Sequence, residues 1–159
     1  MMSTLKSHYL DASALVKLLL EEEGSELLRT YFRKHTQFYT TPICFAETLG
    51  VLKTKYHGKD VAKYLNACDQ LMTYVMDASI VIDEKEIANQ QTYSEVEKLA
   101  QKHGLDISDA FQIVTLRRGL LARVGGESWP ILITADSQLA DAVRQEGLRV
   151  WDCMKERVP

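Results

Sequence analysis

The stretch from His8 to Glu23, HYLDASALVKLLLEEE, begins with the apolar and aromatic residues typical of a β-strand and then places a carboxylate, Asp11, inside the apolar run. Its first residues, 8–13, predict a short strand. The run is interrupted again by Lys17 and ends in three glutamates, so we expect neither a signal peptide nor a membrane span. A strand explains the apolar residues of this stretch, but it does not explain Asp11.

Short apolar runs of this kind recur along the chain, separated by helix-length amphipathic segments. The predicted strands cover residues 8–13, 37–41, 79–83, 131–134 and 148–151. Strands that alternate with helices imply right-handed crossovers and a mainly parallel sheet covered on both faces. The sequence therefore predicts a three-layer α/β domain with about five strands, whose functional site lies at the carboxyl ends of the strands.

Helix start and stop signals mark several of the intervening segments. Thr41 followed by Pro42 has the pattern of an N-cap with proline at the first helical position, and Ser108 is the predicted cap of a later helix. Gly104 predicts the end of the helix that precedes Ser108. The predicted helices cover residues 42–58, 59–77, 86–104 and 109–119, and a loop is predicted at 124–130.

Size and composition predict a single domain spanning residues 1–159, because 46% of the residues are hydrophobic and 26% are charged. The three cysteines lie far apart, without the spacing of zinc sites or disulfide frameworks, so we expect a reducing, cytoplasmic setting. The formal net charge of −3 argues only weakly against a nucleic-acid binder. Carboxylates neutralised by metal ions would count as negative here while presenting a cationic site to a phosphate.

Some acidic residues stand in stretches that are otherwise free of Asp, Glu, Lys and Arg. Asp11, Glu47 and Asp136 each stand alone, and Asp106 and Asp109 share a fourth stretch. An isolated carboxylate in an apolar run carries a desolvation cost of several kcal/mol unless it is paired, exposed or bound to a metal. Because these acids have no basic neighbours in sequence, we expect the fold to gather them around a hard divalent cation, Mg²⁺ or Mn²⁺.

Two hydroxyls strengthen this interpretation. Ser13 follows Asp11 by two residues and Thr134 precedes Asp136 by two, spacings that place hydroxyl and carboxylate on the same side of an extended backbone. Each hydroxyl would orient its carboxylate or a phosphate oxygen. Taken singly, the acids also fit ordinary roles, since Asp caps turns and helices, Asp109 and Asp136 suit helix N-termini, and Glu47 suits a solvated helix face. The combination favours a metal site.

Other chemistries fit less well. An aspartyl-phosphate enzyme would need a second acid two residues after Asp11, where Ser13 stands, and no glycine-rich phosphate loop is present in the sequence. The four histidines have no metal-binding pair spacing; they are His8, His35, His57 and His103. Candidate phosphate contacts are Lys17, Arg117, Arg118, Arg123 and Arg144.

The chain resembles the PIN domain family, in particular the small single-domain VapC-type toxins of toxin–antitoxin pairs. The resemblance runs from Tyr9 to about Trp151 and rests on the segments YLDASALVKL, TPICFAETLGVL, GLDISDAFQIVTL and LITADSQLADAVRQEGLRVW. The family's metal-binding acids fall on Asp11, Glu47, Asp109 and Asp136, and its accompanying hydroxyls on Ser13 and Thr134. The resemblance leaves Asp106 as either a supporting or a capping residue.

What the resemblance implies is a sheet of order 3-2-1-4-5 and a magnesium- or manganese-dependent endoribonuclease that is the toxin of a VapBC-type pair. Its implied partners are RNA, a small antitoxin protein and a second protomer in a homodimer. Apolar surface on the helices between Leu15 and Leu71 is the candidate partner surface. Independently of the family, carboxylates that hold one or two cations can activate water and neutralise charge on a phosphodiester, which would leave 5′-phosphate and 3′-hydroxyl ends.

Two alternatives remain open at this point. The chain could be a PIN-like module that binds RNA or protein without cutting, or a non-toxin PIN nuclease that acts on DNA or structured RNA during processing. Measurement of divalent-metal binding distinguishes the non-cutting module from the nucleases. A neighbouring gene that encodes a small antitoxin would distinguish a toxin from a processing nuclease.

Overall fold

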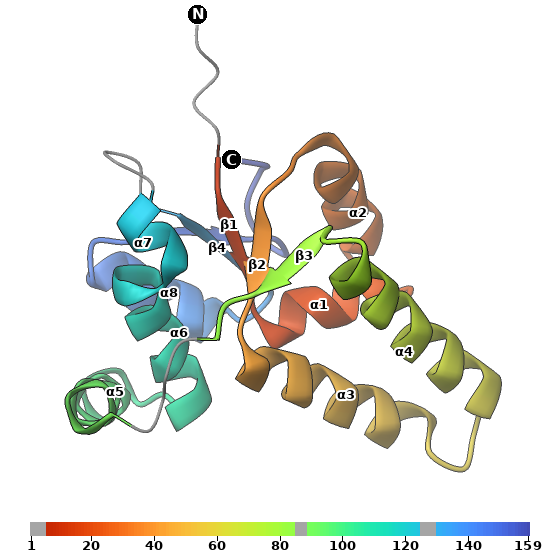
Figure 1. The fold of residues 1–159 in the computed structure, drawn as a ribbon, viewed down its shortest axis with the longest axis horizontal. Helices are drawn as coiled ribbons and strands as arrows, with labels where there is room; N and C mark the ends of the chain where they lie inside the picture. Colours follow the sequence, from red (N-terminus) through yellow and green to blue (C-terminus); the bar gives the residue numbers. More distant parts are fainter. Residues whose placement is uncertain (1–5, 85–88, 125–129) are drawn as a thin grey trace, which may run out of the picture.

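The computed structural model describes residues 6–84, 89–124 and 130–159. Its sheet consists of parallel strands in the order β3-β2-β1-β4-β5 (Figure 1). The strands are β1 His8–Leu10, β2 Phe38–Thr40, β3 Ile80–Ile82, β4 Ile131–Thr134 and β5 Arg149–Asp152. The predicted α/β class, parallel pairing and strand order are therefore confirmed.

Helices connect the strands and form the two outer layers. They are α1 Ala12–Leu19, α2 Ser25–Lys34, α3 Pro42–Tyr56, α4 Val61–Met76, α5 Gln90–His103, α6 Ile107–Arg118, α7 Leu120–Val124 and α8 Ser137–Gln145. The predicted helix 86–104 begins later, at Gln90, although residues 85–88 lie outside the described part of the chain. Most of the loop predicted at 124–130 also lies outside it. Among the described residues, no helix is long and apolar enough to cross a membrane.

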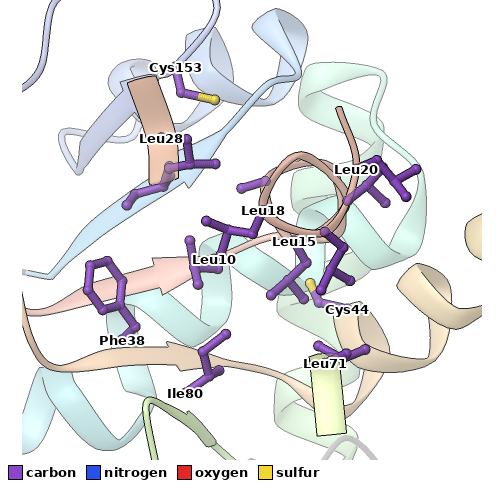
Figure 2. Packing of buried hydrophobic residues seen from close by; sticks show 14 of the residues in the cluster. Leu10, Leu15, Leu18, Leu20, Leu28, Phe38, Cys44, Leu71, Ile80 and Cys153 are labelled. Carbon is purple, nitrogen blue, oxygen red and sulfur yellow. The ribbon is translucent and has the colours of Figure 1, made fainter. Parts of the chain in front are cut away.

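The core lies on both faces of the sheet, because neighbouring side chains of a strand point to opposite faces. Leu10 and Ile133 belong to one buried cluster, with side chains of α1 to α4, whereas Tyr9 and Leu132 belong to a second cluster, with side chains of α5, α6 and α8. Figure 2 shows Leu10 packed among residues of the first cluster. The alternation accounts for the three-layer architecture.

Two helix starts differ from the prediction. The first strand ends at Leu10 and not at residue 13, because Asp11 caps α1 and its carboxylate accepts a hydrogen bond of 2.9 Å from the Ala14 N–H. The N-cap of α6 is Asp106 and not Ser108, since the Asp106 carboxylate accepts the Asp109 N–H at 2.8 Å. Both corrections place an acid immediately before the first residue of the helix.

Two other predicted signals are confirmed. The Thr41 hydroxyl accepts the Cys44 N–H at 3.2 Å at the start of α3. Gly104 ends α5 in the left-handed conformation with φ +64°, which glycine adopts without the strain that a side chain would cause.

Candidate active site

Asp11 lies at the carboxyl end of β1, and it is almost fully buried, with 4% of its surface exposed. One carboxylate oxygen, Oδ1, accepts hydrogen bonds from the Ser13 hydroxyl at 2.7 Å and the Ala14 N–H at 2.9 Å. The other, Oδ2, accepts from the Thr134 hydroxyl at 2.6 Å. Burial raises the pKa of Asp11 to about 6 against the opposing effect of these hydrogen bonds. The carboxylate is thus held rigidly in one orientation.

The two hydroxyls serve the same acid. Ser13 contacts Asp11 as expected, although it lies in the first turn of α1 and not in a strand. Thr134 donates to Asp11 rather than to Asp136, whose own N–H donates to the Thr134 hydroxyl at 2.9 Å. The reason is the register of neighbouring strands: Leu10 pairs with Ile133, so the residues that follow them, Asp11 and Thr134, also lie side by side.

Asp136 follows β4 and caps α8. Its Oδ1 accepts the N–H groups of Gln138 at 2.9 Å and Leu139 at 3.2 Å. The capping role that the sequence offered as the ordinary alternative is therefore present. It uses Oδ1 alone and is compatible with a second role for the same carboxylate.

Asp109 lies half-buried in the first turn of α6, on the other side of the same sheet edge. Its pKa is raised to about 7, first by burial and then by the negative charges of Asp106, Asp136, Asp11 and Glu47. The other three predicted metal ligands therefore lie within electrostatic range of Asp109. The four acids come from four separate segments of the chain, and the other three repel a negative charge on Asp109.

Glu47 and Asp106 are exposed at the rim of this group and share a contact that the sequence did not predict. The Ser108 hydroxyl lies 2.6 Å from Glu47 Oε1 and 2.9 Å from Asp106 Oδ1, so it links α3 to the start of α6. One hydroxyl proton can serve only one of these carboxylates at a time. The sequence predicted Ser108 only as a helix cap. Its spacing of two residues from Asp106 is the sequence feature that indicates the Ser108–Asp106 contact.

The predicted ligands make hydrogen bonds to other groups of the protein in this structure. Among residues 6–84, 89–124 and 130–159, no three His, Cys, Asp or Glu side chains are disposed to hold a metal ion. The carboxylates are instead directed to other partners: Asp11 to Thr134 and Ser13, Glu47 to Ser108, and Asp136 to the amides of α8.

The donor set itself fits a hard divalent cation. Carboxylate and hydroxyl oxygens are the ligands that Mg²⁺ and Mn²⁺ prefer, and these oxygens gather where the chain leaves several negative charges close together. The pKa of Asp109 is raised first by burial and then by the charges of the neighbouring acids. A cation would relieve that repulsion.

The basic residues proposed as phosphate contacts are engaged elsewhere. Arg117 pairs with Glu95 and Glu146, and Arg118 with Glu95. These arginines lie at the far end of α6, about 12 Å along the helix from Asp109 at 1.5 Å per residue. Arg144 pairs with Asp141 and Glu156, Lys17 is buried, and the Arg123 side chain lies outside the described residues. For the four of these side chains that the structure describes, the contacts give no support for phosphate binding.

Comparison with known proteins identifies the fold. The family model of the PIN domain matches residues 8–145. The chain belongs to the PIN domain family. PIN domains are in general metal-dependent nucleases, which agrees with a site made of acids. A comparison with curated protein sequences finds no match.

Solved structures agree on the fold. PAE2754 from Pyrobaculum aerophilum is similar at 18% sequence identity and a TM-score of 0.61, over 92% of this chain and 90% of its own. FitAcB from Neisseria gonorrhoeae is similar at 15% identity and a TM-score of 0.58, over 94% of this chain and 99% of its own. At such low identity the likeness concerns the fold alone.

Proposed function

We propose that this PIN domain is a divalent-metal-dependent endoribonuclease that hydrolyses RNA phosphodiester bonds and is the toxin of a VapBC-type toxin–antitoxin pair. The observation that carries the proposal is the electrostatic coupling of Asp109 to Asp11, Glu47 and Asp136 at the carboxyl edge of the sheet. Family membership supports it, since PIN domains are in general nucleases.

Asp11, Glu47, Asp109 and Asp136 would hold Mg²⁺ or Mn²⁺. When bound, the cation supplies positive charge that offsets the charge developing on a phosphodiester and on its leaving oxygen. The remaining chemistry is positional. Ser13 and Thr134 fix both oxygens of Asp11, and the Ala135 N–H donates to the Ser13 hydroxyl at 2.8 Å, so this part of the site is rigid before substrate binds.

RNA cleavage tests the proposal. The wild type is expected to cut RNA with Mn²⁺ or Mg²⁺, and Asp11→Asn and Asp109→Asn to lose activity by about 100-fold or more, because each removes a charge from the metal-holding set. Asp60→Asn is the control, since Asp60 is a helix cap of α4 outside the site. Equal cleavage by all four proteins would contradict the proposal.

A second candidate function is a PIN-like module that binds RNA or protein without cutting. It is favoured by the side-chain positions, in which no three of the described acids, cysteines or histidines are disposed to hold a metal. Calorimetric titration with Mn²⁺ decides between the two. Heat from wild type that Asp109→Asn abolishes supports the nuclease, and no heat from either supports the module. A nuclease that processes DNA or structured RNA without a toxic role would share the metal result and differ in substrate.

The antitoxin and a second protomer also belong to this proposal. Leu15 and Leu71, the bounds of the predicted partner surface, are buried in the core. Apolar side chains that are exposed in this region include Val51 on α3 and Val61 and Leu65 on α4, and Met72 and Met76 lie on α4 just beyond it. These are the residues that a partner helix or a second copy would cover.

A further inference from the structure

A pocket of about 440 Å³ opens directly beside the acidic site. Ser13 and Ala135, which form part of the hydrogen-bonded frame around Asp11, also line this pocket. Its other walls include the apolar side chains of Val16, Val51 and Met154. A ligand in this pocket would therefore lie between α1 and α3 and continue into the site.

An opposite-charge pair belongs to the lining of the pocket, together with Ser13. Lys17 and Glu22 both line it, and Lys17 Nζ lies 3.5 Å from Glu22 Oε2 and donates to the Glu23 carbonyl at 2.8 Å. These contacts use two of the three N–H groups of the ammonium. The Glu22 carboxylate is also contacted by Lys55 through its other oxygen. These contacts leave one ammonium N–H of Lys17 and lone pairs of the Glu22 carboxylate for further partners, so the lining holds a donor group beside an acceptor group.

Resting on the nuclease function proposed above, we propose that this pocket binds a guanine base of the nucleotide next to the scissile phosphate. Guanine alone among the RNA bases carries an acceptor, O6, beside two donors, N1–H and N2–H, along one edge. Lys17 would donate to O6 and the Glu22 carboxylate would accept from N1–H and N2–H. The apolar walls would cover the faces of the ring.

The same pair rejects the other purine. Adenine would direct its N6–H₂ donor toward the ammonium and its N1 acceptor toward the carboxylate, leaving both protein groups desolvated and unpaired. Specificity of this kind needs only the two charged side chains. It also gives Lys17 a role that differs from the phosphate contact expected from the sequence.

Cleavage of a randomised RNA library, with sequencing of the cut ends, tests the inference. Wild type is expected to show guanine enriched about tenfold or more at one of the two nucleotides that flank the cut. Glu22→Gln is expected to lose that preference while still cutting, because an amide offers one acceptor oxygen and an NH₂ donor group in place of two acceptor oxygens. Glu21→Gln is the matched control: it makes the same change on a residue that pairs with Arg29 and does not line the pocket.

A second variant and a modified substrate test the pocket without relying on Glu22→Gln alone. Val51→Trp fills the pocket and is expected to abolish the preference, whereas Val158→Trp, at an exposed residue that does not line the pocket, keeps it. Inosine in place of guanosine at the preferred position removes the N2–H donors and is expected to slow wild-type cleavage about fivefold or more.

The outcomes separate the two proposals. Metal-dependent cleavage without a guanine preference, or with a preference unchanged in Glu22→Gln and Val51→Trp, overturns the guanine pocket and leaves the nuclease intact. An unchanged preference in Val51→Trp together with lost binding of a protein partner would assign the pocket to that partner and also overturn it. No metal-dependent cleavage by wild type overturns the nuclease and the pocket with it.

Discussion

Replacing Asp109 with Asn is expected to stabilise the metal-free protein at neutral pH. The folded state raises the pKa of this carboxyl from 3.8 to about 7, through burial and then the neighbouring acids, which are led by Asp106. A raised folded pKa means that the unfolded chain releases its proton first, so the stability of the metal-free protein falls as pH rises from about 4 to about 7. Asn reproduces the uncharged state and removes this loss.

The magnitude follows from the size of the shift. About three pKa units correspond to about 4 kcal/mol at 1.36 kcal/mol per unit, as an upper limit. Because Asp109 is only half-buried, and because Asn loses a favourable interaction with the N-terminus of α6, we expect a net gain of about 1–2 kcal/mol. For a chain of this size that corresponds to an increase in Tm of about 2–8 °C.

Thermal and urea unfolding at pH 7 and pH 5 in a chelator provide the measurement. Asp109→Asn should exceed wild type at pH 7 and lose most of that advantage at pH 5, while Asp60→Asn, which changes an exposed cap of α4, should gain nothing. Added Mn²⁺ should reduce the difference, because it stabilises wild type by binding the folded state. An Asp109→Asn variant that is no more stable than wild type at pH 7 would refute the electrostatic coupling of the site.

Two further predictions concern the rest of the fold. Gly119→Ala should destabilise the protein by about 2–3 kcal/mol in urea unfolding, because a Cβ there would lie 2.5 Å from the Thr115 carbonyl oxygen. Gly50→Ala is the control and should be neutral or stabilising, since a Cβ there would have nothing within 4 Å. Equal effects of the two substitutions on stability would contradict the steric argument. Glu146, whose pKa is lowered to about 2 chiefly by Lys102, contributes stability that is present above about pH 4.5 and lost as pH falls toward 2. Between pH 6 and pH 3 the unfolding free energy of wild type should therefore fall by about 1–2 kcal/mol more than that of Glu146→Gln. Equal falls in the two proteins would refute this contribution of Glu146.

The sequence predicted the architecture because its signals are local. Each strand is a short apolar run, and the first four are followed by segments with helical periodicity, so alternation alone implies a parallel sheet. The candidate acids were found in the same way, since a carboxylate without charged neighbours is visible in the sequence. The strand order came from the family resemblance, because periodicity does not determine which strands are neighbours.

What the sequence missed depends on contacts between distant segments. Thr134 was matched to Asp136 by spacing, but the pairing of β1 with β4 gives it to Asp11. Ser108 bridges to Glu47 across a gap of 61 residues in sequence. The pocket beside the site brings α1 and α3 together with Met154 near the end of the chain, and its residues share no pattern in sequence.

The arrangement of acids links stability to function. The hydrogen bonds that fix Asp11 also keep it charged against burial, since without them its pKa would rise further above 6. Asp109 has no comparable support from its described neighbours, and the surrounding carboxylates raise its pKa to about 7. Repulsion among these acids therefore falls mainly on Asp109. The residue whose neutralisation should most stabilise the metal-free protein is the one whose charge a bound cation would most favour, so Asp109→Asn should gain stability and lose metal affinity together.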